Sequence, residues 1–194
     1  MDAAVLVVDM QNGFLAPAGS SPMMGFGTPN ADQLIHENVA LLSEARSAGL
    51  PIVYTRLAYR PDLLDMPARV RAVCPTGAEW LISGSWDAAI VDELAPVAGD
   101  TIIDKNRFDA FLYTDAEMVL RTLGVRRLLV TGVVTYICVE TTVRAAQQRD
   151  FEVNVASDCV GGPDAALHEA SMLVMSKLFA HVSTWREALP GFIG

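Results

Sequence analysis

The sequence predicts a single-domain α/β fold in which helices flank a mostly parallel central sheet, giving three layers. The chain has 194 residues, about the length of one domain, and 52% of them are hydrophobic, enough for one large core. Short apolar runs rich in valine alternate with segments of helical periodicity, which is typical of parallel strands joined by crossover helices. No repeat or linker interrupts this alternation, so we expect one domain over residues 1–194.

The first half of the chain contains two strands, one long helix and an irregular segment. Residues 3–9, AAVLVVD, are continuously apolar before the acid, which predicts a strand buried on both faces. Thr28 and Pro29 are typical of a helix start, and apolar residues then repeat at helical spacing until Gly49. A second strand is expected over 51–56. Prolines and glycines interrupt residues 57–100, so we expect a long excursion with one short helix near 88–94.

The second half returns to regular alternation. Apolar runs bounded by turn residues predict strands, and the segments between them show helical periodicity. The expected strands are 101–104, 126–134, 151–158 and 181–184, and the expected helices are 114–123, 136–149 and 163–179.

Charge and composition exclude several classes of partner. The 14 basic and 23 acidic residues give a net charge of −9, which argues against binding to nucleic acid or to an anionic membrane surface. No apolar run reaches the roughly 18 residues of a membrane-spanning helix, and an acid at position 2 is unlike a secretory signal. We therefore expect a cytoplasmic protein.

Three chemically active side chains follow predicted strands. Asp9 ends the first strand, Lys105 follows the third, and Cys138 lies just after the fourth, in the first turn of the next helix. Strand carboxyl ends meet at one edge of a parallel sheet, and a helix start lowers the pKa of a thiol. The pattern indicates a nucleophilic Cys138, with Asp9 as the base and Lys105 balancing the charge. Taken singly, each has an ordinary alternative: a packing thiol, a turn carboxylate and a solvated lysine.

The other cysteines and the histidines suggest no metal or disulfide. Cys159 follows a strand but lies in a predicted turn, so we expect a structural role, and we expect no role for Cys74 in the excursion. Three cysteines far apart match neither a disulfide framework nor a zinc site.

The chain resembles the isochorismatase-like cysteine hydrolases, which include nicotinamidases, N-carbamoylsarcosine amidase, biuret hydrolase and ureidoacrylate amidohydrolases. The resemblance rests on LVVDMQNGF, IIDKNRFDAF and GVVTYICVETTVRAA, in the family's order. It implies a catalytic triad of Asp9, Lys105 and Cys138. It also implies a cis peptide bond between Val133 and Val134, and an oxyanion hole formed by backbone N–H groups of Val134, Thr135 and Cys138.

Two departures narrow what the resemblance implies. Nicotinamidases bind a metal through histidines after the second strand, and this chain has no histidine between His36 and His168, so we expect no metal and no cofactor. Because the thiol is present, acyl transfer at a carbon–nitrogen bond is favoured. The tract YTRLAYRPDLLDMP resembles the biuret and ureide branch, whereas Tyr136 stands where many relatives carry Asn or Asp.

The resulting prediction is an amidohydrolase that cleaves a small non-peptide amide, imide or ureide through a thioester. One alternative is a vinyl-ether hydrolase of the isochorismatase type. An alternative from another class is a non-catalytic interaction module that keeps the fold.

Further residues are candidates for the pocket and for assembly. We expect Phe14, Phe108 and Tyr136 to give an apolar lining, and Asn12, Arg56 or Arg107 to orient the polar end of the substrate. The alternative is that the aromatic residues are core residues and the arginines are solvated. A mean hydropathy of +0.31 despite the net charge, together with the resemblance, predicts a homo-oligomer, either a dimer or a tetramer. Lids or interface pieces are expected from residues 17–29 and from the excursion that holds Trp80 and Trp86.

Overall fold

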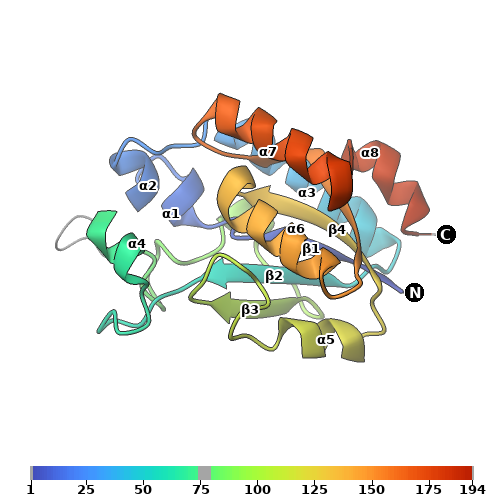
Figure 1. Cartoon of the computed structure of the whole chain (residues 1–194), viewed down its shortest axis with the longest axis horizontal. Helices are drawn as coiled ribbons and strands as arrows, with labels where there is room; N and C mark the ends of the chain where they lie inside the picture. Colours follow the sequence, from blue (N-terminus) through green and yellow to red (C-terminus); the bar gives the residue numbers. More distant parts are fainter. Residues whose placement is uncertain (1, 74–79, 194) are drawn as a thin grey trace.

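Six parallel strands form one sheet in the order β3-β2-β1-β4-β5-β6 (Figure 1). The computed structural model describes residues 2–73 and 80–193. Every strand pair within these residues is parallel, which confirms the predicted α/β fold. The strands are β1 (Ala3–Val8), β2 (Ile52–Leu57), β3 (Thr101–Lys105), β4 (Arg127–Val133), β5 (Glu152–Gly161) and β6 (His181–Ser183).

Helices connect the strands and cover both faces of the sheet. The α-helices are α1 (Asn12–Leu15), α2 (Ser20–Met23), α3 (Ala31–Ser47), α4 (Ala68–Val73), α5 (Ala116–Thr122), α6 (Glu140–Gln147), α7 (Ala165–Leu178) and α8 (Trp185–Ala188). Two 3₁₀ turns, η1 (Asp92–Leu94) and η3 (Leu189–Gly191), and one π turn, η2 (Thr135–Val139), complete the elements of the described residues. Among these residues no helix is both long and apolar enough to cross a membrane.

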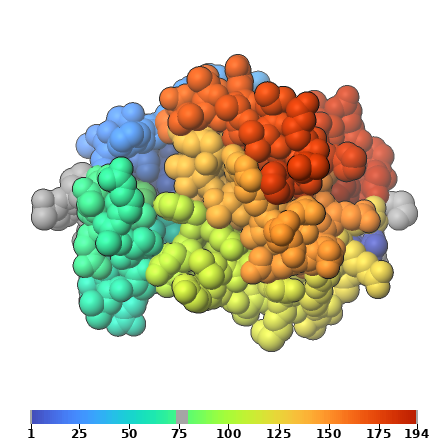
Figure 2. Space-filling view, in the orientation of Figure 1, coloured from blue at the N-terminus to red at the C-terminus, as the bar shows by residue number. Residues whose placement is uncertain are grey.

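The central strand β1 is the most deeply buried part of the sheet. All six of its residues are 0% exposed, because β2 and β4 flank it and helices cover it above and below. Alternate side chains enter two separate cores. One core packs against α3 and α8, and the other against α5, α6 and α7. The space-filling view shows α6 and α7 covering much of the near face (Figure 2).

The order of the strands places a crevice at one end of the sheet. After β1 the chain builds β2 and β3 on one side, and then crosses to build β4, β5 and β6 on the other. The carboxyl ends of β1 and β4 therefore border a topological switch point, where ligands of open α/β sheets bind. The short helices α1, α2 and α4 gather at this end, opposite both chain termini (Figure 1).

The excursion between β2 and β3 differs from its prediction. The expected helix near 88–94 is reduced to η1, because Ile90 instead forms an antiparallel bridge with Gln11. The buried Gln11 amide also donates to the carbonyls of Leu57 and Ala88 and accepts from the Leu57 N–H. These long-range hydrogen bonds, rather than local propensity, set the path of the segment. The helix α4 lies in the same excursion and was not predicted.

Two element boundaries also differ from the sequence-based expectation. Helix α3 begins at Ala31 after Asn30, which has a positive φ of 57° and makes no side-chain cap, so the expected start at Thr28 and Pro29 is wrong. Strand β5 continues to Gly161. Cys159 therefore lies inside a strand, fully buried, instead of in a turn.

The contact between β1 and β4 requires a glycine at position 132. Gly132 has a φ of +116°, and a Cβ atom there would lie 1.9 Å from the Val8 carbonyl oxygen. Both the φ angle and the backbone of the central strand exclude a larger residue.

We expect Gly132→Ala to lower the free energy of unfolding by more than about 3 kcal/mol, since the new methyl group would push β4 away from β1. Gly99→Ala is the matched control, because Gly99 has a φ of +102° but open space around it. Gly99→Ala should lower the free energy of unfolding by only about 1 kcal/mol. Urea unfolding followed by circular dichroism measures the stability of both variants. Equal losses of stability would contradict the close approach of β4 to β1 at Gly132.

Candidate active site

Asp9 follows β1 directly and is held in an unusual backbone conformation. Its φ is +53°, in the left-handed region that non-glycine residues rarely adopt, and its side chain is completely buried. The Oδ1 atom accepts a hydrogen bond of 2.7 Å from the Thr55 hydroxyl at the end of β2. The turn at Asp9 thus holds Oδ1 in a hydrogen bond to the neighbouring strand, and Oδ2 faces the site.

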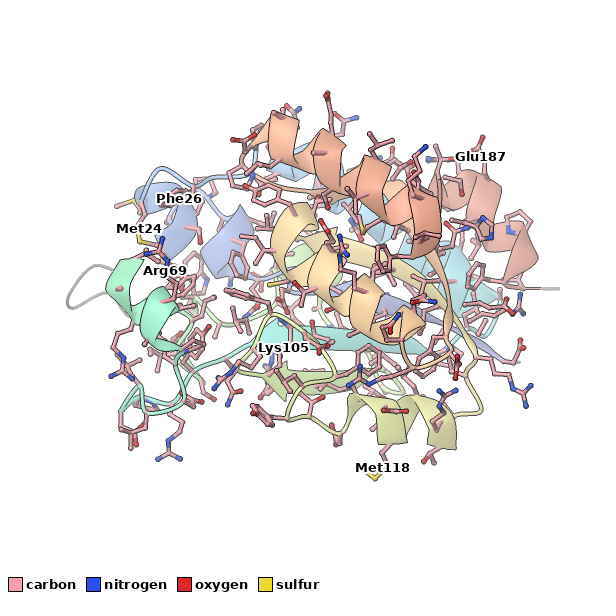
Figure 3. The ribbon with its side chains drawn as sticks, viewed as in Figure 1. Met24, Phe26, Arg69, Lys105, Met118 and Glu187 are labelled. Carbon is pink, nitrogen blue, oxygen red and sulfur yellow. The ribbon has the colours of Figure 1, made fainter. Side chains whose placement is uncertain are left out.

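Lys105, the last residue of β3, forms an ion pair with Asp9. Its Nζ lies 2.7 Å from Asp9 Oδ2, and both side chains are 0% exposed. Nζ also donates to the carbonyls of Arg107 and Phe108, at 3.0 and 3.1 Å. Burial lowers the pKa of Lys105, but the opposing attraction of Asp9 and Cys138 is larger in sum, and the net shift of the pKa is upward. Lys105 is therefore a charged lysine inside the protein (Figure 3).

Cys138 completes the group from the other side of β1. It lies in η2, the π turn that joins β4 to α6, and it is 2% exposed. Its thiol is hydrogen-bonded to the side chains of Asp9 and Lys105, and the Val134 N–H contacts the sulfur. The structure thus brings together the three residues of the predicted triad, one from each of β1, β3 and the turn after β4.

The expectation of a low thiol pKa is wrong. Burial raises the pKa of Cys138, the Lys105 charge opposes this increase, and the Asp9 carboxylate adds to it. Cys138 lies in the first turn of the helical segment after β4, as predicted, because η2 begins at Thr135 and continues directly into α6, but the effect of burial on the pKa is larger. The thiol is therefore protonated at neutral pH.

The turn that carries Cys138 is anchored to α7. The Val133–Val134 peptide bond is cis, at the position implied by the resemblance. The Thr135 hydroxyl lies 2.9 Å from His168 Nδ1, and the Ser171 hydroxyl bonds the Glu140 carboxylate at 2.5 Å. Burial lowers the pKa of His168, so its imidazole is neutral at neutral pH. These contacts hold the backbone beside the thiol in one position.

A cavity of about 560 Å³ opens onto Cys138. Its lining is largely apolar and comes from α1, the α2 region, α4, η2 and the start of α7. Phe14, Phe108 and Tyr136, which the sequence analysis singled out, are among the lining residues, and their contact with a substrate stays a prediction. The other described residues of the lining are Ser21, Met24, Gly25, Phe26, Thr28, Leu57, Val70, Val73, Trp80, Val134, Ile137, Cys138, Pro163, Asp164 and Leu167.

Three polar candidates lie outside the described lining of this cavity. The Asn12 amide donates to the Trp86 carbonyl at 2.9 Å and ties α1 to the excursion. Arg56 forms two hydrogen bonds with Asp104, its partner in the register of β2 and β3. Arg107 donates to the carbonyls of Asp65 and Asn106. The structure gives these side chains protein partners, so it does not bring them to the substrate position that we expected.

Sequence reasoning missed the contributions of α4 and α7 to the cavity. Val70 and Val73 belong to a helix that the prolines around it concealed. Asp164 and Leu167 lie at the start of α7, after the short turn that follows β5, and Asp164 Oδ1 accepts from the Leu167 N–H as a helix cap. The sequence signal available for this position was the pair of Pro163 and an acidic residue shortly after a strand.

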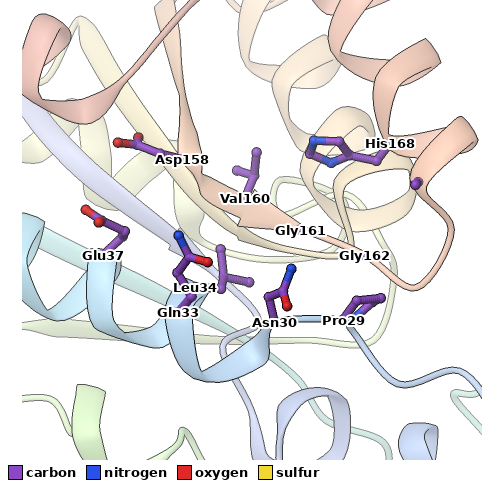
Figure 4. A pocket seen from close by; sticks show the side chains of 11 residues that line it. Pro29, Asn30, Gln33, Leu34, Glu37, Asp158, Val160, Gly161, Gly162 and His168 are labelled. Atoms are coloured by element: carbon purple, nitrogen blue, oxygen red, sulfur yellow. The ribbon is translucent and has the colours of Figure 1, made fainter.

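A second, shallower cleft of about 320 Å³ lies on the other side of the β5–α7 turn (Figure 4). It is bordered by α3, by the end of β5 and by His168. Its carboxylates are engaged, since Glu37 accepts from Trp185 and Arg186. Nowhere in residues 2–73 and 80–193 do three or more His, Cys, Asp or Glu side chains form a group that could hold a metal ion. Cys74 lies outside the described residues.

The fold and the cysteine-centred site define a class of hydrolase, and comparison with known proteins gives the family. The isochorismatase domain family matches residues 3–187, and the chain belongs to this family. Ureidoacrylate amidohydrolase RutB from Caulobacter vibrioides is 31% identical over 93% of this chain and 87% of its own.

Solved structures give the same result. A cysteine hydrolase from Pseudomonas syringae pv. phaseolicola superposes with a TM-score of 0.88 at 30% identity, covering 97% of this chain and 91% of its own. N-carbamoylsarcosine amidase from Thermoplasma acidophilum superposes with a TM-score of 0.76 at 26% identity, covering 95% of this chain and 97% of its own.

The raised pKa of Cys138 leads to a direct test in the free protein. Because the thiol holds its proton more tightly than an ordinary cysteine, we expect the midpoint of its titration to lie above pH 9.0, the ordinary value. The difference in far-ultraviolet absorbance between the wild type and Cys138→Ala isolates its titration. A thiolate signal with a midpoint below that pH would show that Lys105 outweighs burial.

Proposed function

We propose that this protein is a cysteine-dependent amidohydrolase that cleaves the carbon–nitrogen bond of a small non-peptide amide, imide or ureide through a thioester at Cys138. The observation that carries the proposal is the contact of the Cys138 thiol with the buried Asp9–Lys105 pair at an apolar cavity. The family and the amidohydrolases among the relatives support cleavage of carbon–nitrogen bonds other than peptide bonds.

Formation of the thioester begins with proton transfer within the triad. As the sulfur attacks the substrate carbonyl carbon, Asp9 accepts the thiol proton and a carbon–sulfur bond forms. The negative charge that develops on the carbonyl oxygen is stabilised by backbone N–H groups of the turn at Val134, Thr135 and Cys138, as the resemblance implies. Lys105 remains protonated and keeps the charge of the buried site balanced.

The carbon–nitrogen bond then breaks and the thioester is hydrolysed. Asp9 gives the proton to the leaving nitrogen, which departs as ammonia or an amine. A water molecule takes its place, Asp9 removes its proton, and the hydroxide attacks the thioester carbon. The carbon–sulfur bond breaks, and the proton on Asp9 returns to the sulfur.

The position of the thiol favours this reaction over hydrolysis of a vinyl ether. The latter reaction requires an acid but no nucleophilic sulfur. In this site Cys138 contacts both members of the ion pair and lies at the cavity, where a carbonyl carbon can reach it. A thiol in this position is suited to acyl transfer.

Replacement of Cys138 by alanine should lower kcat/KM for amide hydrolysis by at least about 10³-fold, since the nucleophile is lost. Cys159→Ala is the matched control, because this cysteine is buried in β5 away from the described cavity lining and should be dispensable. Acid quenching during turnover, followed by mass spectrometry of the Cys138 peptide, should show the added acyl group. Retained amide hydrolysis in Cys138→Ala would exclude the thioester.

A further inference from the structure

The cavity at Cys138 has an unusual balance of charge. None of its described lining residues is a lysine or an arginine, and Asp164 is the carboxylate among them. The lining is otherwise formed mainly by aromatic and aliphatic side chains.

The buried cation nearest to the thiol is already fully engaged. Lys105 directs its ammonium group at Asp9 and at the carbonyls of Arg107 and Phe108. An ammonium group has three N–H donors, and these contacts together with the Cys138 thiol leave none of them for a substrate. Because Asp9 also neutralises its charge, Lys105 offers no net attraction to a carboxylate on the substrate.

The arginines considered from the sequence are engaged as well. Arg56 is bound to Asp104, and Arg107 to backbone carbonyls. Arg69 on α4 is exposed, and it lies at the same end of the molecule as Met24 and Phe26 (Figure 3). Its neighbour Val70 lines the cavity. A cation at such a solvated position interacts weakly with a buried anion, because water and salt screen it.

Asp164 adds a negative potential at the start of α7. Its Oδ1 caps the helix at Leu167, and its backbone N–H contacts the Tyr136 hydroxyl. Asp164 is solvent-exposed, so its repulsion of an anion is modest. The larger effect comes from the apolar lining, where a carboxylate would lose water without gaining an ionic partner.

We propose that the substrate is an uncharged amide with an apolar body, and that amides carrying a carboxylate are disfavoured. The inference rests on the proposed amidohydrolase function and defines its substrate class. It separates this protein from the similar ureidoacrylate amidohydrolases, whose named substrate is a carboxylate.

The test compares hexanamide with adipamate, its analogue in which a carboxylate replaces the terminal methyl group, and with ureidoacrylate. We expect kcat/KM for ammonia release from hexanamide to exceed that of either anion by at least about 30-fold. Equal or greater rates with the anions would overturn the proposal.

Binding to Cys138→Ala distinguishes a failure of this inference from a failure of the proposed function. If the wild type hydrolyses none of the compounds, but the variant binds hexanamide and not adipamate in ligand-observed NMR, the amidohydrolase proposal fails and the inference about the pocket stands. Preference for adipamate, or binding of neither compound, would overturn the inference.

Two charge variants identify the groups responsible. Asp164→Asn keeps a helix-capping residue and removes the negative charge. The ratio of kcat/KM for hexanamide to that for adipamate should therefore fall by about threefold. Asp115→Asn, the same substitution at the start of α5, is the control and should leave the ratio unchanged. If the wild type instead prefers adipamate and Arg69→Gln abolishes that preference, Arg69 is an anion-binding residue and the proposal is wrong.

Discussion

The buried ion pair between Asp9 and Lys105 constrains the whole carboxyl edge of the sheet. Its two side chains come from β1 and β3, are fully buried, and meet across the end of β2 at 2.7 Å. An unpaired charge at this depth would be strongly unfavourable, so the pair requires the observed register of three strands. Thr55 on the intervening strand completes the arrangement by donating to Asp9. The register of these strands and the geometry of the site therefore depend on the same ion pair.

The same pair determines the chemistry that the site supports. Because Lys105 is neutralised by Asp9, it does not convert Cys138 into a resting thiolate, and burial keeps the sulfur protonated. Asp9 lies within hydrogen-bond contact of the thiol and can take the proton as attack proceeds. In the mechanism that we propose, the reactivity of the thiol therefore depends on a bound substrate. The internal charge balance also leaves the cavity apolar in character, which links the ion pair to the substrate class that we infer.

Much of the fold and part of the site could be predicted from the sequence. Short apolar runs bounded by turn residues identified every strand of the described sheet, and the rule of strand carboxyl ends brought Asp9, Lys105 and Cys138 together. Other features depend on contacts between distant segments. Ile90 pairs with Gln11, Arg56 pairs with Asp104 on the neighbouring strand, and burial raises the pKa of Cys138. Local patterns contain none of this information, so the helix expected over 88–94 and the low pKa of the thiol were predicted incorrectly, and the role of Arg56 toward a substrate stays a prediction.

A double-mutant cycle between Asp9 and Lys105 tests the central claim most directly. The free energies of unfolding of the wild type, Asp9→Asn, Lys105→Met and the double variant give the coupling between the two side chains. Each single variant leaves one buried charge without its partner, whereas the double variant removes both charges. The account predicts that the double variant is more stable than the sum of the single losses implies, with a coupling of about 3 kcal/mol or more. Losses that add to within about 0.5 kcal/mol would contradict it.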